Sequence, residues 1–512
     1  MKSRTSTWFT AIALLTALAL PLQAPQGKVK QHQPHQYHHY QIVDPGTFGG
    51  ANSSQLYPSP RGDVNNRGVA VGGADTSIPD PTSTCFNGDC YISYGYKWED
   101  GITHKLDALP GFNSSGALGV SNNGHVVGTS ENGIDPLTGG RALVAVSWEQ
   151  DGSIIDLGSL GGNEGVAYSV NNRGEAVGVA LNTIPDPYAW FFSIPGATQS
   201  HAFRWTKSRG MQDLGTLGGA DSTAAWINDR GQIYGYSSTD YTVNQVTGLP
   251  TTHPFLWENG TMTDLGTLGG TLAGPFYGPS GPESIGGLNN RGDVIGTSSL
   301  AGDVTTHPFP WTKSGGMQDL GTLPGGTYGF ATWLNDAREV VGLSDTGNGL
   351  HAFFWRDGVM TDLLTVGSDP NSQATSINSR GQVVGGSFDS NFTDLHGFLW
   401  EDGGSIADLN TLVPPGSSVF VPAAIGINDR GEIAAKGVLP NGDEHAVLLV
   451  PCDENHPGVE GCDYSMVDAN AVVARTAPSA GARNASSRRL PSSLMRRMNR
   501  YRSFGAPFGQ RN

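Results

Sequence analysis

The chain contains a unit that reads His201-Ala202-Phe203-Arg204-Trp205, then Asp213-Leu214-Gly215-Thr216-Leu217-Gly218-Gly219, then Ile227-Asn228-Asp229-Arg230-Gly231. The last element, a short Asn-rich motif, recurs eight times along the 512 residues. Its final position falls at Gly68, Gly124, Gly174, Gly231, Gly292, Arg338, Gly381 and Gly431. A self-similar pattern with a period of about 50 residues is typical of a closed or stacked array of small sheets.

Around this motif, residues alternate with a period of two, as in Gln232-Ile233-Tyr234-Gly235-Tyr236, which is typical of strands. Asn-Asp-Arg-Gly between two such runs predicts a type I turn whose final Gly is left-handed. A second turn, such as Trp257-Glu258-Asn259-Gly260, follows the Trp strand, so that two hairpins form a four-stranded sheet. The sixth copy has Arg338 in place of Gly, and we expect a strained turn that costs on the order of 1 kcal/mol.

The fold that this pattern predicts is all-β: an eight-bladed β-propeller of four-stranded blades over residues 42–450. The last unit ends with the strand 445–450 and lacks an Asp-Leu-Gly strand of its own. The missing strand is present at residues 42–50, so we expect the N-terminal strand to close the last blade. An open, stacked array of the same sheets is the alternative.

The His-Ala-Phe element with Trp two residues on, spaced by Asp-Leu-Gly-Thr-Leu-Gly-Gly, resembles the HAF-repeat family of extracellular repeat proteins. The resemblance covers residues 43–450. It implies secretion, and it transfers no activity or catalytic residue. The first, second and eighth copies depart from the pattern: the first two have Gly95-Tyr96-Lys97-Trp98 and Val144-Ala145-Val146-Ser147-Trp148, and the last lacks the Trp.

The two ends of the chain differ from the repeats. Residues 1–24 predict a cleaved signal peptide, because two basic residues precede an apolar run that is too short to span a bilayer. Residues 25–41 predict a solvated, His- and Gln-rich linker, with divalent metal binding as the alternative. The histidines of that linker are His32, His35, His38 and His39. Residues 463–512 hold nine Arg against two Asp and predict a disordered basic tail, or one that contacts anionic lipid or a surface polymer.

The four cysteines fall into two local pairs, Cys85 with Cys90 and Cys452 with Cys462, which predict disulfides in an exported protein. The second disulfide would close the loop 451–462. The formal net charge is -16, and subtracting the +7 of the tail leaves about -23 on the rest of the chain. An acidic body repels phosphate backbones, so nucleic acid is not an expected partner. No segment after the N-terminus is long and apolar enough for a membrane span.

Histidine and tryptophan recur at the same place in most repeats, so we interpret them as structural rather than catalytic. The set comprises His201, His253, His307, His351 and His396, with Trp205, Trp257, Trp311, Trp355 and Trp400. A buried imidazole needs a hydrogen-bond partner, and an Asp of the same repeat, such as Asp213 or Asp264, is the expected one. The sequence predicts no catalytic residue, metal site or cofactor.

The repeats differ mainly in one connection, which is long in the first four copies (residues 73–93, 129–143, 179–200 and 236–252) and short in the last four. A further insertion, residues 271–287, is expected between the last strand of one blade and the first strand of the next. Both kinds of connection would emerge on one face. The aromatic residues expected there are candidate ligand-binding residues, unless they only pack their own loops: Tyr94, Tyr188, Trp190, Tyr241 and Tyr277.

The sequence therefore predicts a secreted, non-catalytic binding or structural module, located outside the cell, at its surface or in the periplasm. Its ligand face would be formed by the long loops of blades one to five, with a polysaccharide or a surface protein as partner. The alternative is an exported glycan-active enzyme, a lyase or hydrolase. Four acids are available for that chemistry, without a spacing that pairs them: Glu131, Asp135, Asp186 and Glu283. A structural protein that binds only copies of itself is a third possibility.

Overall fold

The computed structural model describes residues 36–54, 64–81, 85–86, 90–134, 141–186, 198–247, 249–274, 286–390, 394–401 and 403–468. All of them belong to one compact unit, residues 35–512. This part of the chain is built of strands, with one short helix, α1 (Leu409–Leu412), so the all-β prediction is confirmed. The expected signal peptide, residues 1–24, lies outside the described residues. Among the described residues, no helix has the length and apolarity needed to cross a membrane.

The first three repeats each form an antiparallel four-stranded sheet in chain order. The first sheet consists of β3 (Gly49–Ser54), β4 (Ala70–Pro79), β5 (Tyr91–Glu99) and β6 (Ile102–Leu106). The second consists of β7 (Ser115–Val120), β8 (Val126–Ile134), β9 (Arg141–Trp148) and β10 (Ile154–Asp156). The third consists of β11 (Gly165–Val170), β12 (Ala176–Pro185), β13 (Thr198–Thr206) and β14 (Gly210–Asp213).

The fourth and fifth repeats share one nine-stranded sheet. The fourth repeat supplies β15 (Ser222–Ile227), β16 (Ile233–Val243), β17 (Pro250–Glu258) and β18 (Thr261–Asp264). The fifth supplies β19 (Gly269–Gly274), β20 (Gly287–Leu288), β21 (Val294–Leu300), β22 (Thr306–Thr312) and β23 (Gly316–Met317). The two halves are joined by one parallel pair, Thr252 opposite Leu272, between β17 and β19.

The last three repeats again form four-stranded sheets. The sixth consists of β24 (Gly329–Leu334), β25 (Val340–Asp345), β26 (Leu350–Arg356) and β27 (Val359–Leu364). The seventh consists of β28 (Asn371–Ile377), β29 (Val383–Phe388), β30 (Leu395–Trp400) and β31 (Ala407–Asp408). The eighth contains β32 (Phe420–Ile427), β33 (Ile433–Val438) and β34 (Glu444–Pro451). Its outer strand is β2 (Tyr40–Val43), which comes from the other end of the chain and pairs antiparallel with β34.

The Asn-rich motif forms the turn between the first two strands of a sheet, and Asn228 shows why Asn is needed there. Its Oδ1 accepts hydrogen bonds from the backbone N–H groups of Arg230 and Gln232, each 3.0 Å long. Gly231 closes the turn with an N–H bond to the backbone oxygen of Asn228 and has a φ of +81°. A short side-chain acceptor and a residue without Cβ are what this turn requires.

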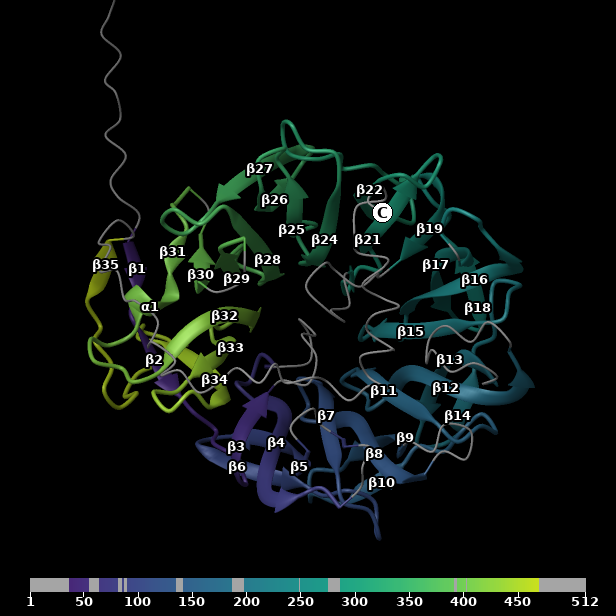
Figure 1. Ribbon diagram of the computed structural model, residues 1–512, viewed down its shortest axis with the longest axis horizontal. Helices are drawn as coiled ribbons and strands as arrows, with labels where there is room; N and C mark the ends of the chain where they lie inside the picture. The colour runs from purple at the N-terminus through teal and green to yellow at the C-terminus, as the bar shows by residue number, and fades with distance from the viewer. Residues whose placement is uncertain are drawn as a thin grey trace, which may run out of the picture. The chain divides into compact units, whose positions relative to one another are not determined.

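The same asparagines also link seven of the eight turns to the turn of the next repeat, and the second turn, which has Ser121 at this position, is joined to the third through Asn123. Asn228 Nδ2 donates to the backbone oxygen of Asn289 at 2.9 Å. Equivalent bonds run from Asn65 to Ser121, Asn171 to Asn228, Asn289 to Asn335, Asn335 to Asn378, Asn378 to Asn428 and Asn428 to Asn65. Figure 1 shows the sheets placed around a common centre in chain order, with β7, β11, β15, β24, β28 and β32 the innermost strands of their sheets.

The sixth turn keeps its shape although Arg338 replaces Gly. Arg338 has a φ of +67°, and its N–H still bonds to the backbone oxygen of Asn335. The strain expected from the sequence is therefore present. Its guanidinium forms two bonds to the buried Asp293 of the preceding repeat, 2.8 and 3.1 Å long. This charged pair offsets part of the cost of the left-handed backbone.

The hydrophobic core lies between successive sheets. Between the third and fourth sheets, for example, Val177 and Ala202 pack with Ala224, Ile233 and Phe255. The motif tryptophans contribute to these layers: Trp205 and Trp400 are buried, and Trp257, Trp311 and Trp355 are half-buried. The repeated sheets therefore depend on one another for burial of their apolar faces.

The two ends of the described chain pair with each other. Residues 36–41, expected to be a solvated linker, instead contain β1 (Gln36–His38) and the start of β2, and Tyr37 and Tyr40 are fully buried. β35 (Met466–Asp468), expected to belong to a disordered tail, pairs with β1. Both predicted disulfides, Cys85–Cys90 and Cys452–Cys462, are present and therefore confirmed. Residues 25–35 and 469–512 lie outside the described residues.

Two expectations about the long connections are corrected. Much of the segments 73–93, 129–143, 179–200 and 236–252 is strand, because the middle hairpins continue beyond the core of their sheets. The insertion expected between two blades at residues 271–287 instead interrupts the first strand of the fifth repeat. β19 and β20, on either side of it, both pair with β21. Proline and glycine there masked the strand pattern.

Candidate functional site

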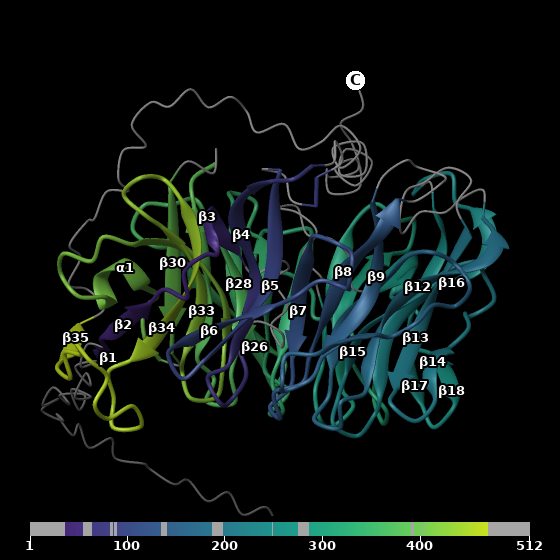
Figure 2. The same ribbon diagram turned by 90° about the horizontal axis from the view of Figure 1, so that it is seen from below.

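Four neighbouring repeats carry elongated middle hairpins, β4–β5, β8–β9, β12–β13 and β16–β17, which we call the raised hairpins. Their second strands contain 10, 9, 10 and 11 residues, against 7, 6, 6 and 6 in the later repeats. All of these hairpins connect the second and third strands of a sheet and so end on one face (Figure 2). The extra length is therefore concentrated over one part of that face.

The structure describes two of the five predicted ligand-binding aromatics. Tyr241 lies near the end of β16 with its side chain 59% exposed. Tyr94 lies within β5, where it takes the place of the motif histidine, and is half-buried. Phe48 packs edge-on against its ring and Lys105 Nζ lies 4.2 Å from the ring centroid. Three residues lie outside the described residues: Tyr188, Trp190 and Tyr277.

A buried ion-paired group fixes the ends of the first two raised hairpins. The guanidinium of Arg141 pairs with the carboxylates of Asp80 and Glu131, and all three side chains are buried. Glu131 also accepts hydrogen bonds from the backbone N–H groups of Asn113 and Ser114. Burial lowers the pKa of Arg141, against the opposite effect of the charge of Asp80. The charged groups of Asp80, Glu131 and Arg141 therefore stabilise the ends of these hairpins.

A pair of buried carboxyl groups fixes the third raised hairpin. Asp186, just after β12, and Asp221, just before β15, are both almost completely buried and hydrogen-bond to each other. Ser200 donates to Asp221 from its backbone N–H and its hydroxyl, at 2.9 and 2.8 Å. Burial, opposed by these bonds and supported by the charge of Asp186, raises the pKa of Asp221 to about 7. The carboxyl of Asp221 therefore keeps its proton to a higher pH than an exposed aspartate does.

The anchoring acids belong to a repeated pattern that the sequence analysis missed. The sequence at the end of β4, in the first raised hairpin, reads Ser77-Ile78-Pro79-Asp80-Pro81. The sequence at the end of β12, in the third, reads Thr183-Ile184-Pro185-Asp186-Pro187. In both, the Ile is exposed and the side chain of the Asp is buried. Aligning the sequences of the long connections with one another would have revealed the shared Ile-Pro-Asp-Pro pattern.

The motif histidines form ion pairs with aspartates, as the sequence suggests for Asp213 and Asp264. Five Nδ1-to-carboxylate contacts are 2.7 to 2.9 Å long: His201–Asp213, His253–Asp264, His307–Asp319, His351–Asp362 and His445–Asp44. In each pair the Asp also accepts the backbone N–H two residues further on. These histidines are therefore bound within the framework, in accordance with a structural role.

The pair His445–Asp44 connects the last sheet to the strand that completes it. Burial would raise the pKa of Asp44, but hydrogen bonds from His445 and from the N–H of Gly46 lower it overall. The hydrogen bond with Asp44 raises the pKa of His445. This pair, which we call the latch, joins the N-terminal strand to the last sheet through a charge-assisted hydrogen bond.

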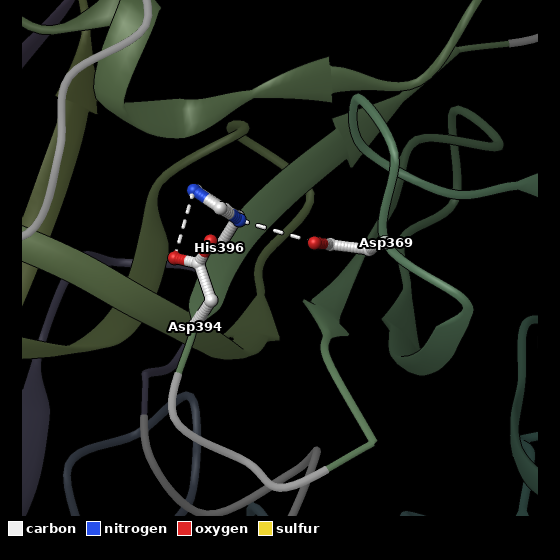
Figure 3. A group of neighbouring side chains, drawn as sticks. All are labelled: Asp369, Asp394 and His396. Atoms are coloured by element: carbon white, nitrogen blue, oxygen red, sulfur yellow. Dashed lines mark hydrogen bonds and ion pairs between the residues drawn. The ribbon is translucent and has the colours of Figure 1, made fainter.

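The seventh repeat breaks this arrangement. Its His396 has Asp369 Oδ2 at 3.2 Å from Nδ1 and Asp394 Oδ1 at 3.6 Å from Nε2 (Figure 3). The Asp of its own repeat, Asp408, instead accepts the N–H of Asn410 and caps α1. Among the described residues, this is the one group with donors close enough for a metal ion. However, its ring nitrogens face carboxylates on opposite sides, so a single ion could take only one of them.

The opposite end of the common centre holds a polar cavity. It has a volume of about 180 Å³ and is lined by the Asn-rich turns of the eight repeats. Asn122, Asn172 and Asp229 are typical lining residues, and each already accepts a backbone N–H of the preceding turn through Oδ1. The acceptors around this cavity therefore serve first to join the turns.

No family model matches the chain, and no curated protein matches it. Among solved structures, the β-propeller domain of the Trilobed protease from Pyrococcus furiosus is 9% identical, with a TM-score of 0.38, over 72% of this chain and 95% of that chain. A puromycin-hydrolyzing peptidase of Mycobacterium tuberculosis is 12% identical, with a TM-score of 0.39, over 79% and 61%. An oligogalacturonate lyase in complex with manganese is 11% identical, with a TM-score of 0.36, over 82% and 98%. Likenesses this distant say nothing of activity.

Proposed function

We propose that this chain is an exported, closed eight-bladed β-propeller of the HAF-repeat kind that acts as a non-catalytic binding module. Its ligand face is the one on which the raised hairpins end. The two disulfides support export, because such bonds persist in oxidising compartments.

The hydrogen bonds between turns support the closed ring. Each Asn-rich turn is bonded to the next, and the eighth, through Asn428, is bonded to the first at Asn65. The pairing of β2 with β34 supports the same closure at the outer edge. The nine-stranded sheet is compatible with two separate blades, because a single residue pair, Thr252 with Leu272, joins its halves.

The raised hairpins are the observation that carries the binding function. A framework of repeated sheets needs only short connections, as in β25–β26 and β29–β30. Additional chain on one face of a rigid framework is where binding residues gather. The face extends over the first four repeats, together with the interrupted first strand of the fifth, and its expected partner is a polysaccharide or a surface protein.

Of the four candidate acids, Asp135 and Glu283 lie outside the described residues, and the two that are described favour a non-catalytic role. Glu131 is buried against Arg141, and Asp186 is buried against Asp221. A glycosidase needs two carboxyl groups that reach the substrate. The Asp186–Asp221 pair is the one observation that favours the alternative, an exported glycan-active enzyme, since one of its carboxyls retains a proton near pH 7. Turnover of a polysaccharide that Asp221→Asn abolishes without loss of binding would establish that alternative.

The test is binding of the full chain to an array of polysaccharides and surface proteins. A first variant has residues 187–197, between β12 and β13, replaced by a short Gly-Ser linker. A matched control has the short connection 439–443, between β33 and β34, replaced in the same way. We expect the first variant to lose binding and the control to retain it. Binding that survives in the first variant, or is lost equally in both, would overturn the assignment of the face.

A further inference from the structure

The four raised hairpins each expose an apolar side chain at the same distance along the chain. Ile78, Ile134, Ile184 and Tyr241 are 56, 55, 52 and 59% exposed. Each stands eight residues after the strand residue that opposes the motif tryptophan, namely Ala70, Val126, Ala176 and Ile233. Isolated exposed apolar residues are common, but recurrence at the same sequence distance on four consecutive repeats is not expected by chance. We call these four residues the apolar crest.

At the equivalent position, the repeats with short hairpins that the structure describes there do not continue the crest. Counted from Val294, Val340 and Ile433, the same position is occupied by Gly302, Asn348 and Asn441, all exposed. Glycine and asparagine there are ordinary turn residues. At this position the apolar side chain is therefore confined to the raised hairpins, although Val304, in the connection between β21 and β22, is also exposed.

The crest residues are held rigidly. Pro79 and Pro185 follow Ile78 and Ile184, and the next residue in each case is one of the buried aspartates. The Asp80 carboxylate is fixed by Arg141. Isoleucine itself has little rotamer freedom, so its burial against a partner costs little entropy. Anchored, stiff apolar side chains are preorganised for contact.

The strand edges beside the crest are closed to further pairing. The N–H of Ile78 is bonded to Thr76 Oγ1 at 3.1 Å, and the N–H of Ile184 to Asn182 Oδ1 at 2.8 Å. At the fourth hairpin, Asp240 Oδ1 accepts the N–H of Thr242 at 2.8 Å. The two prolines lack an N–H altogether. A partner that adds a strand is therefore disfavoured, and contact through the apolar side chains remains.

Acidic groups predominate among the charged side chains described at these hairpin ends, which disfavours a polyanion as partner. Arg141 pairs with both Asp80 and Glu131, which leaves one negative charge on these three groups. Asp186 is buried, and Asp240 lies half-buried beside Tyr241. The acidic body, about -23 without the tail, disfavours a second copy of the chain as partner. Exposed apolar residues on separate hairpins suit an extended apolar boundary.

From these observations we propose that the apolar crest inserts its four side chains into the surface of a lipid layer, at the boundary between headgroups and acyl chains. This inference rests on the proposed use of the same face for binding and names an additional partner there. Three isoleucines supply the apolar contact, and Tyr241 suits the interface because its ring is apolar and its hydroxyl polar. Attachment of this kind depends little on salt, unlike attachment through basic residues.

The test is co-sedimentation of the full chain with phosphatidylcholine vesicles at low salt and in about 1 M NaCl. The test variant is I78S/I134S/I184S/Y241S. The control variant, I102S/V359S, changes two equally exposed apolar residues on the outer strands β6 and β27. We expect salt-independent binding by the wild type and the control. Each crest substitution should lower partition roughly fivefold, and all four more than about 100-fold.

A gain of signal provides a second measurement that does not depend on the fourfold variant. The described cysteines are all in disulfides, so Ile184→Cys can be labelled with an environment-sensitive dye. We expect its emission to shift to the blue with phosphatidylcholine vesicles. No binding by the wild type, equal binding by the crest variant, or binding only to anionic vesicles at low salt would overturn the proposal. If polysaccharide binding persisted in that case, the proposed binding function would stand without the lipid contact.

Discussion

Asn428 donates a hydrogen bond of 2.8 Å from Nδ2 to the backbone oxygen of Asn65, 363 residues earlier in the chain. The adjacent residues reinforce this contact. Asp429 donates its N–H to Asn66 Oδ1, and Asn66 Nδ2 donates to Asp429 Oδ2. Turns of consecutive repeats are joined by the same kinds of bond. The junction between the last and first turns thus matches the internal junctions, as the proposed closed ring requires.

The latch between Asp44 and His445 predicts a pH-dependent contribution to stability. Asp44 has a lowered pKa, so its contribution is present above the unfolded value of about 4 and is lost as the pH falls. His445 has a raised pKa, so its contribution is present below about 6.5 and is lost as the pH rises through the folded value. Asp44→Asn should lower the free energy of unfolding by about 1 kcal/mol between these limits, and by less at pH 9.

The measurement is urea denaturation of the wild type and Asp44→Asn at several pH values. Asp213→Asn serves as a control because His201–Asp213 is the same pair within a single sheet. We expect only Asp44→Asn to increase the accessibility of β2 to proteases. Equal protease resistance of the two variants would show that the latch does not hold the N-terminal strand.

The carboxyl pair at the third raised hairpin predicts a loss of stability as the pH approaches neutrality. Because the pKa of Asp221 is raised to about 7, the folded protein binds a proton that the unfolded chain releases near pH 4. Stability should therefore fall between about pH 4 and 7 and then level off. Asp221→Asn should remove this decline, since Asn371 shows that an amide can accept the equivalent N–H bond. Denaturation curves with the same pH dependence for both proteins would contradict the raised pKa of Asp221.

The left-handed residue of the sixth turn gives a prediction that separates strain from ion pairing. Arg338→Ala retains the strain and loses the bonds to Asp293, whereas Arg338→Gly loses the bonds but relieves the strain. The Ala variant should be less stable than the Gly variant by about 1 kcal/mol. Gly381→Ala, at the equivalent left-handed position of the seventh turn, should lose a similar amount. Thermal melts of the three variants check this order, and equal stability of the Ala and Gly variants would rule out the strain.

Much of the framework can be predicted from sequence because its determinants are local. Asn228 and Gly231 specify a turn within five residues, and His253 meets Asp264 across one hairpin. Where a partner comes from elsewhere, the sequence fails. His396 contacts Asp369 of the preceding connection, whereas Asp408 of its own repeat also accepts a bond from Nδ2 of Asn410 and caps a helix that the repeat pattern does not predict. The burial of Tyr37 likewise depends on pairing with a strand at the other end of the chain.

The candidate site was harder to predict than the framework. The raised hairpins contain Pro79 and Pro185, which indicate loops in a sequence, yet both residues end strands. A search of the sequence for exposed aromatic residues misses most of the apolar crest, because three of its four members are isoleucine. Tyr241 alone was selected from the sequence and is also part of the crest. Register between repeats, rather than residue type, is the signal that identifies this surface.

Closure of the ring is tested most directly by cross-linking the first turn to the last. The variant N66C/D429C places two thiols where the side chains of Asn66 and Asp429 are hydrogen-bonded. The control N172C/D229C does the same at an internal junction. The described native cysteines are all in disulfides, so dibromobimane, which joins thiols a few ångströms apart, should react with the introduced pairs. A closed ring predicts equal intramolecular cross-linking of both variants, whereas cross-linking of the control alone would contradict closure and support an open array.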